Sequence, residues 1–177
     1  MATPGSVETA REAEKRVDIF VKIKGIKGES TDDAHKEWLE ALAMSWGVRQ
    51  PAGTASQGPM ARERADFDHL TISKVVDKAS PMIYRYCAAG SHVDEVRIEL
   101  CEQTAARVNF LTIVLNDVHV AAARITGSVT LGGVPRPIEE VAFVYSKIQW
   151  EYVPVGHDGS PGAAMTAGWD LEANTPQ

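Results

Sequence analysis

The sequence contains little cysteine, few aromatic residues and no long apolar run. Of its 177 residues, two are cysteines and 7% are aromatic. Cys87 and Cys101 without clustered histidines make no zinc site, and we expect two buried thiols in a reducing compartment. No stretch approaches the roughly 20 apolar residues of a membrane-spanning helix, so membrane insertion is not expected. Residues 1–16 lack an apolar core, which argues against a secretory signal.

Basic residues are fewer than acidic ones. Lys and Arg together number 18 against 24 Asp and Glu, which gives a net charge of −6. Binding to nucleic acid or to an anionic membrane needs a basic surface, so neither partner is expected. The simplest meaning of this mild acidity is solubility, and the length fits one domain.

Catalytic and metal-binding motifs are missing as well. There is no G-x-S-x-G motif, and no two of the five histidines have the H-x-x-x-H ligand spacing. Asp117 and His119 form the best acid–base pair, although a hydrogen-bonded surface histidine is the simpler interpretation. Asp32 and Asp33 are expected to be solvated, and so are Glu139 and Glu140, because adjacent side chains point in different directions. We therefore expect no enzyme activity, no cofactor and no metal.

Residues 79–89 form the one segment with helix signals at both ends. Ser80 is predicted as the N-cap and Pro81 as the first helical residue, where a missing N–H costs nothing. Gly90 follows the last apolar residue and suits a left-handed C-terminal cap. A single short helix between strands predicts a β structure with one helical plug. The apolar stripe of this helix consists of Met82, Ile83, Tyr86 and Cys87.

Alternating apolar residues predict strands on both sides of this helix. Residues 17–24 alternate between apolar and charged side chains, with Phe20 as an exception. Residues 108–125 are apolar on both faces, which is typical of a strand that is covered on both sides. Residues 138–153 predict a long strand that can bend. One face of it holds Val141, Phe143 and Tyr145, and the opposite face holds Ala142, Val144, Ile148 and Trp150.

Residues 30–46 support two interpretations. Read alone, a Ser or Thr cap and early acidic residues followed by Trp38 and Leu39 are typical of a helix. The later part also alternates as a strand, and periodicity does not decide between the two. In the strand, one face holds Leu42, Met44, Trp46 and Val48, and the other holds Ala43, Ser45 and Gly47.

Three segments carry the composition of turns, loops or tails. Residues 50–65 are rich in Gly, Pro, Ala and Ser, and so long a loop in a compact domain is usually functional or disordered. Residues 127–137, with Gly132, Gly133 and two prolines, predict a turn region. Residues 1–16 predict a mobile N-terminal arm. Roughly six to eight strands and one helix favour an antiparallel barrel or sandwich.

The central segment of the chain resembles that of the hemolysin-coregulated proteins (Hcp), the tube subunits of the bacterial type VI secretion system. It reads VDKASPMIYRYCAAGSHVDEVRIEL, and further similar blocks occur in the family's order over nearly the whole chain after residue 16. The resemblance favours a strand from about Trp38 onward. The chain departs from the family in the extra residues 1–16 and in a 50–65 loop without the usual glycine run. The similar blocks are VDIFVKIKGIKGES, MSWGV, DFDHLTISKVVDKASP, FLTIVLNDVHV, EEVAFVYSKIQWEYVP and GWDLEAN.

The resemblance implies a mainly β fold, a compact antiparallel β-barrel of two sheets with one flanking helix at about 79–89. It implies a single barrel domain over residues 17–177. It also implies a structural role, in which hexameric rings stack into a tube inside a contractile sheath and under a spike. Such a protein starts in the bacterial cytoplasm, is secreted through the type VI system without a signal peptide, and carries effector proteins in its lumen.

Two groups of residues are candidates for contacts in such a tube. The small residues Ala43, Ser45 and Gly47 suit a lumen wall that must not hold cargo too tightly. The 50–65 loop is the candidate for contact with an adjacent subunit or ring. The candidate contact residues in and beside it are Arg49, Gln50, Met60, Arg62, Glu63 and Arg64.

Other functions remain open from the residues alone. A tail-tube subunit of a phage or another contractile particle would share the ring. A β-barrel that binds a small ligand or a sugar would use its tryptophans, Trp38, Trp46, Trp150 and Trp169. Of these, Trp46 and Trp150 fall on apolar strand faces, where core burial is favoured. A hydrolase would depend on Asp117 and His119. The native mass separates a ring from a monomeric binding barrel, and mutation of the acid–base pair tests the hydrolase.

Overall fold

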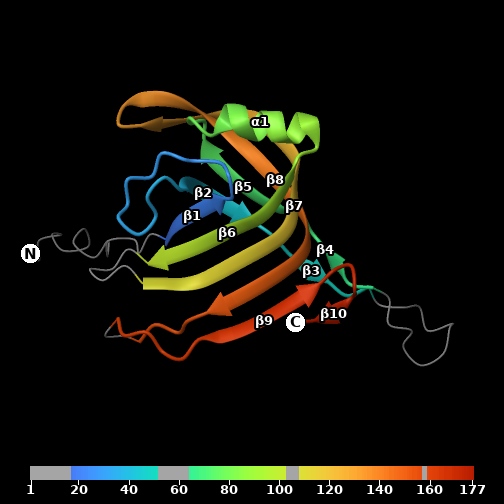
Figure 1. The fold of residues 1–177 in the computed structure, drawn as a ribbon. Helices are drawn as coiled ribbons and strands as arrows, with labels where there is room; N and C mark the ends of the chain where they lie inside the picture. Colours follow the sequence, from blue (N-terminus) through green and yellow to red (C-terminus); the bar gives the residue numbers. More distant parts are fainter. Residues whose placement is uncertain (1–16, 52–63, 103–107, 157–158) are drawn as a thin grey trace, which may run out of the picture.

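The computed structural model describes residues 17–51, 64–102, 108–156 and 159–177 (Figure 1). The predicted N-terminal arm, residues 1–16, lies outside these ranges. Within them the chain is mainly β, and its single helix is neither long nor apolar enough to cross a membrane. The elements are β1 (Val17–Ile23), β2 (Leu39–Ser45), β3 (Val48–Arg49), β4 (Asp66–Phe67), β5 (Leu70–Val75), α1 (Ser80–Ala89), β6 (His92–Glu102), β7 (Val108–Leu131), β8 (Val134–Tyr152), β9 (Met165–Asp170) and β10 (Thr175–Pro176).

Six of these strands close into an antiparallel barrel. The hydrogen-bonded order is β8-β5-β2-β1-β6-β7, and β7 pairs back with β8. β9 pairs with the second half of β8, and β10 pairs with β9. β3 and β4 form a separate two-stranded ribbon at one end of the barrel (Figure 1). The expected mainly β barrel with one flanking helix is therefore confirmed.

Helix α1 has the predicted C-terminal end, but its N-cap differs from the prediction. Gly90 adopts the left-handed conformation with φ 59° and caps the helix as expected. The N-cap is Ala79 and not Ser80, because the Ser80 hydroxyl is used in a buried cluster below the helix. Pro81 lies in the first turn, and Ile83 is fully buried. The rest of the predicted apolar stripe packs against the core.

The buried cluster below α1 ties the helix to β5 and β8. The Lys74 ammonium donates to Glu139 at 2.8 Å and pairs with Asp77 at 2.9 Å. The Ser80 hydroxyl donates to Glu139 at 2.6 Å, and the Tyr84 hydroxyl donates to the other oxygen of the same carboxylate. Lys74 and Glu139 have no exposed surface. The expectation of a solvated Glu139 is therefore wrong, since the partners that make its burial possible lie far away in the sequence.

The predicted 127–137 turn region is mostly strand. β7 and β8 continue as a projecting two-stranded hairpin, and only Gly132 and Gly133 form the turn, with φ 56° and 80° (Figure 1). Two positive φ angles are typical of the turn that matches the twist of a β-hairpin. Pro135 and Pro137 fit because alternate residues of β8 point their N–H positions away from β7. The Pro137 carbonyl accordingly accepts a hydrogen bond from Val76 outside the hairpin, at 3.0 Å.

Three neighbouring strands change their inward face at the same level. Along β7, Leu115 and Val118 are both fully buried although three positions separate them, so the alternation skips a residue. The same break in the alternation occurs at Asp94 on β6, Asp117 on β7 and Ser146 on β8. Asp117 has φ 53°. This shift brings Ile148 into the same core as Phe143, so their predicted opposition along β8 is wrong. The flanking buried residues are Val93, Val96, Tyr145 and Ile148.

Trp46 and Trp150 are only partly buried, and the predicted burial of the cysteines is confirmed for one of two. The Trp46 and Trp150 rings lie 5.4 Å apart between centroids and pack against the core. The Trp46 Nε1–H donates to the Tyr145 hydroxyl at 2.5 Å. Both thiols are free, but Cys101 is buried whereas Cys87 is half-buried.

Candidate functional site

The β3–β4 ribbon carries the described part of the candidate contact loop. Arg49 and Asp66 are cross-strand partners, and the Arg49 Nε donates to the Asp66 carboxylate at 3.3 Å. Both side chains are mostly exposed, so this pair contributes little to stability. Arg64 is exposed two residues before β4, and Gln50 follows β3. Met60, Arg62 and Glu63 lie outside the described residues.

The structure brings the three candidate lumen residues near one end of β2. Ala43 and Ser45 are exposed, as a lumen position requires. The prediction that Leu42 lies on the covered apolar face of this strand is wrong. Leu42 is 48% exposed, because a bulge between Ala41 and Ala43 shifts the alternation of side chains. Val48 is exposed as well. A Cβ on Gly47 would lie 2.9 Å from a carboxylate oxygen of Asp68, so the small residue there also serves local packing.

A groove of about 940 Å³ lies at the opposite end of the barrel from the β3–β4 ribbon. It forms where β1 and β2 separate, because the two strands pair only between Ile19 and Val21 on β1. Five carboxylates and several apolar side chains line it, and no lysine or arginine is among the described residues of its lining. The lining residues are Val17, Asp18, Ile19, Phe20, Glu29, Ser30, Thr31, Asp32, Glu40, Ala41, Leu42, Val75, Asp77 and Leu131.

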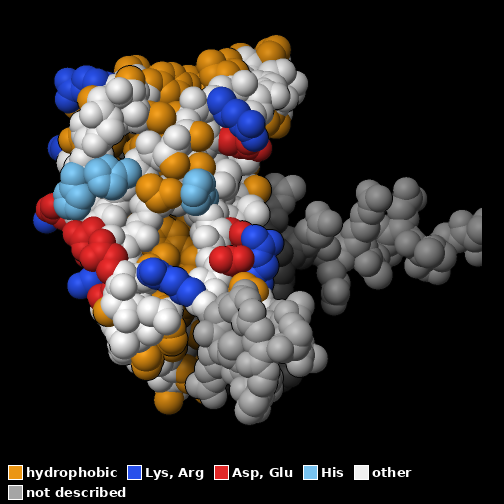
Figure 2. Space-filling view, turned by 90° about the vertical axis from the view of Figure 1, so that its right-hand side faces the viewer, with side chains coloured by type: hydrophobic (Ala, Val, Ile, Leu, Met, Phe, Trp, Pro, Cys, Tyr) orange, Lys and Arg blue, Asp and Glu red, His pale blue; other side chains and the backbone are white. Residues whose placement is uncertain are grey.

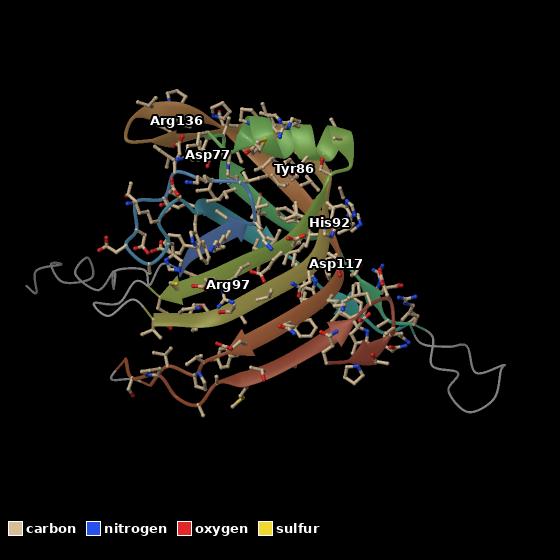
Figure 3. The ribbon with its side chains drawn as sticks, viewed as in Figure 1. Asp77, Tyr86, His92, Arg97, Asp117 and Arg136 are labelled. Atoms are coloured by element: carbon tan, nitrogen blue, oxygen red, sulfur yellow. The ribbon has the colours of Figure 1, made fainter. Side chains whose placement is uncertain are left out.

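Large apolar side chains remain exposed on the described surface. The projecting hairpin of β7 and β8 carries three of them, and Arg136 lies on the same hairpin (Figure 3). Two more face each other across β8 and β9. Exposed apolar groups in this number are typical of surfaces that a partner covers. The residues are Ile125, Leu131 and Val134 on the hairpin, Tyr152 and Met165 on β8 and β9, and Val17, Leu42 and Val48 elsewhere.

A buried histidine, His35, holds residues 24–38 against β1 and β6, and these residues are called the 24–38 loop. The His35 Nδ1 lies 2.6 Å from the Asp32 carboxylate, and its Nε2 lies 2.9 Å from the Glu99 carboxylate. The expectation of a solvated Asp32 is therefore wrong, since its side chain is largely covered. The imidazole stacks on Phe20 with centroids 3.9 Å apart and meets the edge of Trp38 at 4.9 Å. Phe20 is therefore buried on the outer face of β1, which explains why it breaks the alternation.

Backbone hydrogen bonds close the 24–38 loop on itself. The Gly28 N–H donates to the Glu37 carbonyl at 2.7 Å, the Ser30 N–H to the Trp38 carbonyl at 3.0 Å, and the Glu37 N–H back to the Ser30 carbonyl at 2.9 Å. A Cβ at Gly28 would lie 2.2 Å from the Trp38 carbonyl oxygen, which is closer than any side chain can approach. Glycine is therefore required at this position.

Electrostatics around β6 favour an ionised Glu99. Burial alone would raise the pKa of Glu99, but hydrogen bonds from Arg97 and His35 outweigh it, and the pKa lies below its usual range. Arg97 lies on β6 beside it (Figure 3), with its Nε 2.6 Å from the carboxylate. Burial, with smaller effects from Glu99 and Asp18, raises the pKa of the Cys101 thiol to about 11.

The predicted acid–base pair does not form a catalytic arrangement. Asp117 is 3.4 Å from His92 instead of bonding His119, and the two histidine rings lie 5.6 Å apart between centroids. Figure 2 shows histidine and acidic side chains together on one side of this face, and Figure 3 places His92 and Asp117 where the sheet bends. Both partners are about half exposed. Among the described residues, no group of three or more His, Cys, Asp or Glu could hold a metal ion.

Sequence reasoning missed the two buried ionic clusters. The stretch SKVVDKASP lies in a block that resembles the family. Three of its polar side chains, Lys74, Asp77 and Ser80, belong to the cluster around Glu139. The polar residues inside this block were the only sequence signal for the cluster around Glu139. His35 had no such signal, because its second carboxylate, Glu99, lies 64 residues further along the chain.

Comparison with known proteins places this fold in a family. A family model described as "Type VI secretion system effector, Hcp" matches residues 20–152. Protein hcp1 of Pseudomonas aeruginosa is 31% identical over 160 residues, which are 89% of this chain and 97% of that protein. A solved structure of a type six secretion system protein has a TM-score of 0.84 at 29% identity, covering 92% of this chain and all of the other. Hcp1 from Salmonella typhimurium has a TM-score of 0.73 at 31% identity, covering 91% and 99%. The chain therefore belongs to the Hcp family of type VI secretion proteins.

Proposed function

We propose that this chain is the structural tube subunit of a type VI secretion system. Six copies close into a ring, and rings stack into a tube inside a contractile sheath and under a spike. Contraction drives the tube into a target cell, and effector proteins travel in its lumen. The observation that carries this proposal is the family match over residues 20–152, joined to solved relatives that the chain covers along nearly their whole length.

The exposed apolar side chains support contacts between copies. A ring of identical subunits needs two different, complementary surfaces on each subunit. The projecting hairpin with Ile125 and Val134 and the β8–β9 pair Tyr152 and Met165 are separate apolar surfaces of this kind. Their burial between subunits would contribute about 25 cal/mol for each Å² of apolar area.

The native mass tests this proposal most directly. Light scattering after size exclusion is expected to give about six times the subunit mass of 19.2 kDa. A monomer at micromolar concentration and physiological salt would overturn the ring.

The small exposed side chains of β2 are proposed to face the lumen. Ser45→Trp is expected to leave the hexameric ring intact. It is expected to reduce the loading and export of cargo, because the bulky indole side chain narrows the channel. Ala88→Trp on the exposed side of α1 is the matched control and is expected to export normally. Normal loading and export by the Ser45 variant would remove Ala43, Ser45 and Gly47 from the lumen.

The loop beyond the β3–β4 ribbon is proposed to contact the adjacent subunit or ring. Replacement of residues 52–63 by a short Gly-Ser linker is expected to weaken ring or tube assembly while the thermal unfolding of the barrel stays nearly unchanged. A second variant, with a Gly-Ser segment of the original length, distinguishes an effect of loop length from an effect of the loop side chains. Equal loss of assembly and of thermal stability would contradict the contact role.

We also propose that the protein works without catalysis and leaves the bacterial cytoplasm through the type VI system. The separation of Asp117 from His119 supports the first point, since a general base needs an oriented partner. Export is tested by comparing the medium of cells with and without a contractile sheath. Sheath-independent appearance of the protein in the medium would contradict this route.

A further inference from the structure

We propose that His35 is a proton-operated clip that holds the 24–38 loop on the barrel and releases it as the pH rises. Both ring nitrogens face carboxylates, Asp32 at 2.6 Å and Glu99 at 2.9 Å. An ionised carboxylate only accepts hydrogen bonds, so each nitrogen must donate. Only the doubly protonated, positively charged imidazole donates from both nitrogens. The clip lies within one subunit and goes beyond the proposed function.

Among the described residues, carboxylates outnumber cations in the immediate surroundings of the ring. The loop contributes Asp32, and β6 contributes Glu99 with Arg97 bound to its other oxygen. From β1, Lys22 lies over the Trp38 ring at 5.6 Å from the centroid. Asp18 of β1 and the thiol of Cys101 on β6 are further titratable groups on these strands. β6 also carries His92, Asp94, Glu95 and Glu102, and Glu40 of β2 pairs with Phe20. The two carboxylates that touch the imidazole are therefore the groups that retain its second proton.

The link to Glu99 is the part of the clip that joins the loop to the sheet. Asp32 belongs to the loop itself, whereas Glu99 belongs to β6 and is 64 residues away in the chain. When the ring loses its second proton, one nitrogen presents a lone pair to a carboxylate, and attraction becomes repulsion. The imidazole is 5% exposed, so water cannot readily take over the lost contact.

Release of the loop would change the end groove. Ser30, Thr31 and Asp32 form one wall of it, and Phe20, on which the imidazole stacks, lines it as well. The clip is complete where the imidazole is charged and both carboxylates are ionised. It is lost as the pH rises and the ring gives up its second proton. It is also lost in acid, where Glu99 becomes protonated.

Hydrogen exchange of the whole chain tests the clip. The amides of Ser30 and Glu37 report on the loop because both are hydrogen-bonded inside it. Between about pH 6 and pH 9, their exchange is expected to accelerate roughly tenfold beyond the effect of hydroxide alone. Mass spectrometry on peptides gives the amide rates. Exchange of the His35 ring carbon proton, followed in the same samples, gives the ring protonation.

Variants separate the clip from general loosening. His35→Gln is expected to show fast loop exchange at every pH, without the extra acceleration. Glu99→Gln keeps an acceptor oxygen without the charge, so the ring is expected to lose its second proton at lower pH. His119→Gln, on an exposed strand position, is the matched control and should behave as the wild type. If His35→Gln fails to fold, the comparison of the wild type with Glu99→Gln still tests the clip.

Two results would overturn the clip. One is loop exchange in the wild type that follows hydroxide alone across this range. The other is a His35 ring that carries a single proton at pH 6.

Discussion

Two buried ionic clusters hold different parts of this barrel, and they differ in what can titrate. Under α1, Glu139 accepts hydrogen bonds from an ammonium and two hydroxyls, on Lys74, Ser80 and Tyr84. Under the 24–38 loop, an imidazole lies between two carboxylates. The cluster under α1 includes no imidazole among its described members, whereas the proposed clip makes the loop depend on the second proton of His35.

The two clusters behave alike in acid. Burial alone would raise the pKa of Glu139, but hydrogen bonds from Lys74, Ser80 and Tyr84 outweigh it, and the net pKa is lowered. The pKa of Glu99 is lowered as well. A carboxyl with a lowered pKa in the folded state contributes stability above its unfolded value of about 4.3, and this contribution is lost as the pH falls through the folded value. The clusters therefore differ only on the alkaline side.

The largest expected effect comes from breaking the cluster under α1. Lys74→Met leaves the Glu139 carboxylate buried without its counter-charge, and the expected loss is about 3–5 kcal/mol in the free energy of unfolding. Urea denaturation at a fixed protein concentration measures it. The double variant Lys74→Met, Glu139→Gln removes both charges and is expected to lose less than the single one. A single variant within about 1 kcal/mol of the wild type would show that the pair is not strongly coupled.

The next effect concerns the backbone of the 24–38 loop. Gly28→Ala places a Cβ against the Trp38 carbonyl, so the loop must shift, and we expect a loss of about 1–3 kcal/mol in chemical denaturation. Gly127→Ala is the matched control, because no atom lies within 4 Å of its added Cβ. The control is expected to stay within about 0.5 kcal/mol of the wild type. Equal stability of the two variants would contradict the close approach at Gly28.

An effect of similar size concerns one hydrogen bond in the cluster under α1. Tyr84→Phe leaves an oxygen of Glu139 without its donor and is expected to cost about 1–3 kcal/mol. Burial and the bond to Glu139 raise the pKa of Tyr84 to about 12, so its contribution is constant through neutral pH and is lost as the pH rises from about 10 to 12.

The Tyr84 variant should therefore lack part of the alkaline fall in stability that the wild type shows. Tyr152→Phe, at a 46% exposed position, is the control and should keep the whole of it. Identical alkaline profiles for Tyr84→Phe and the wild type would remove Tyr84 from this role.

Local features of the fold could be predicted from the sequence, and long-range ones could not. Gly90 ends the helix through its own backbone conformation, so a short pattern was sufficient. Ser80 has the right chemistry for an N-cap, but Glu139, 59 residues away, takes its hydroxyl. Among the candidate site residues, the exposure of Ala43 and Ser45 agreed with simple alternation, whereas the bulge that exposes Leu42 had no sequence signal.

The bend shared by β6, β7 and β8 limits how such a chain can change in length during evolution. Each of the three strands skips one residue at the level of Asp94, Asp117 and Ser146, and each skip matches that of its neighbours. An insertion or deletion of one residue in a single strand would reverse its inward and outward side chains beyond that point, while the two neighbours kept theirs. Length variation is therefore expected in the connections between strands, and the spacing within these three strands is expected to stay fixed.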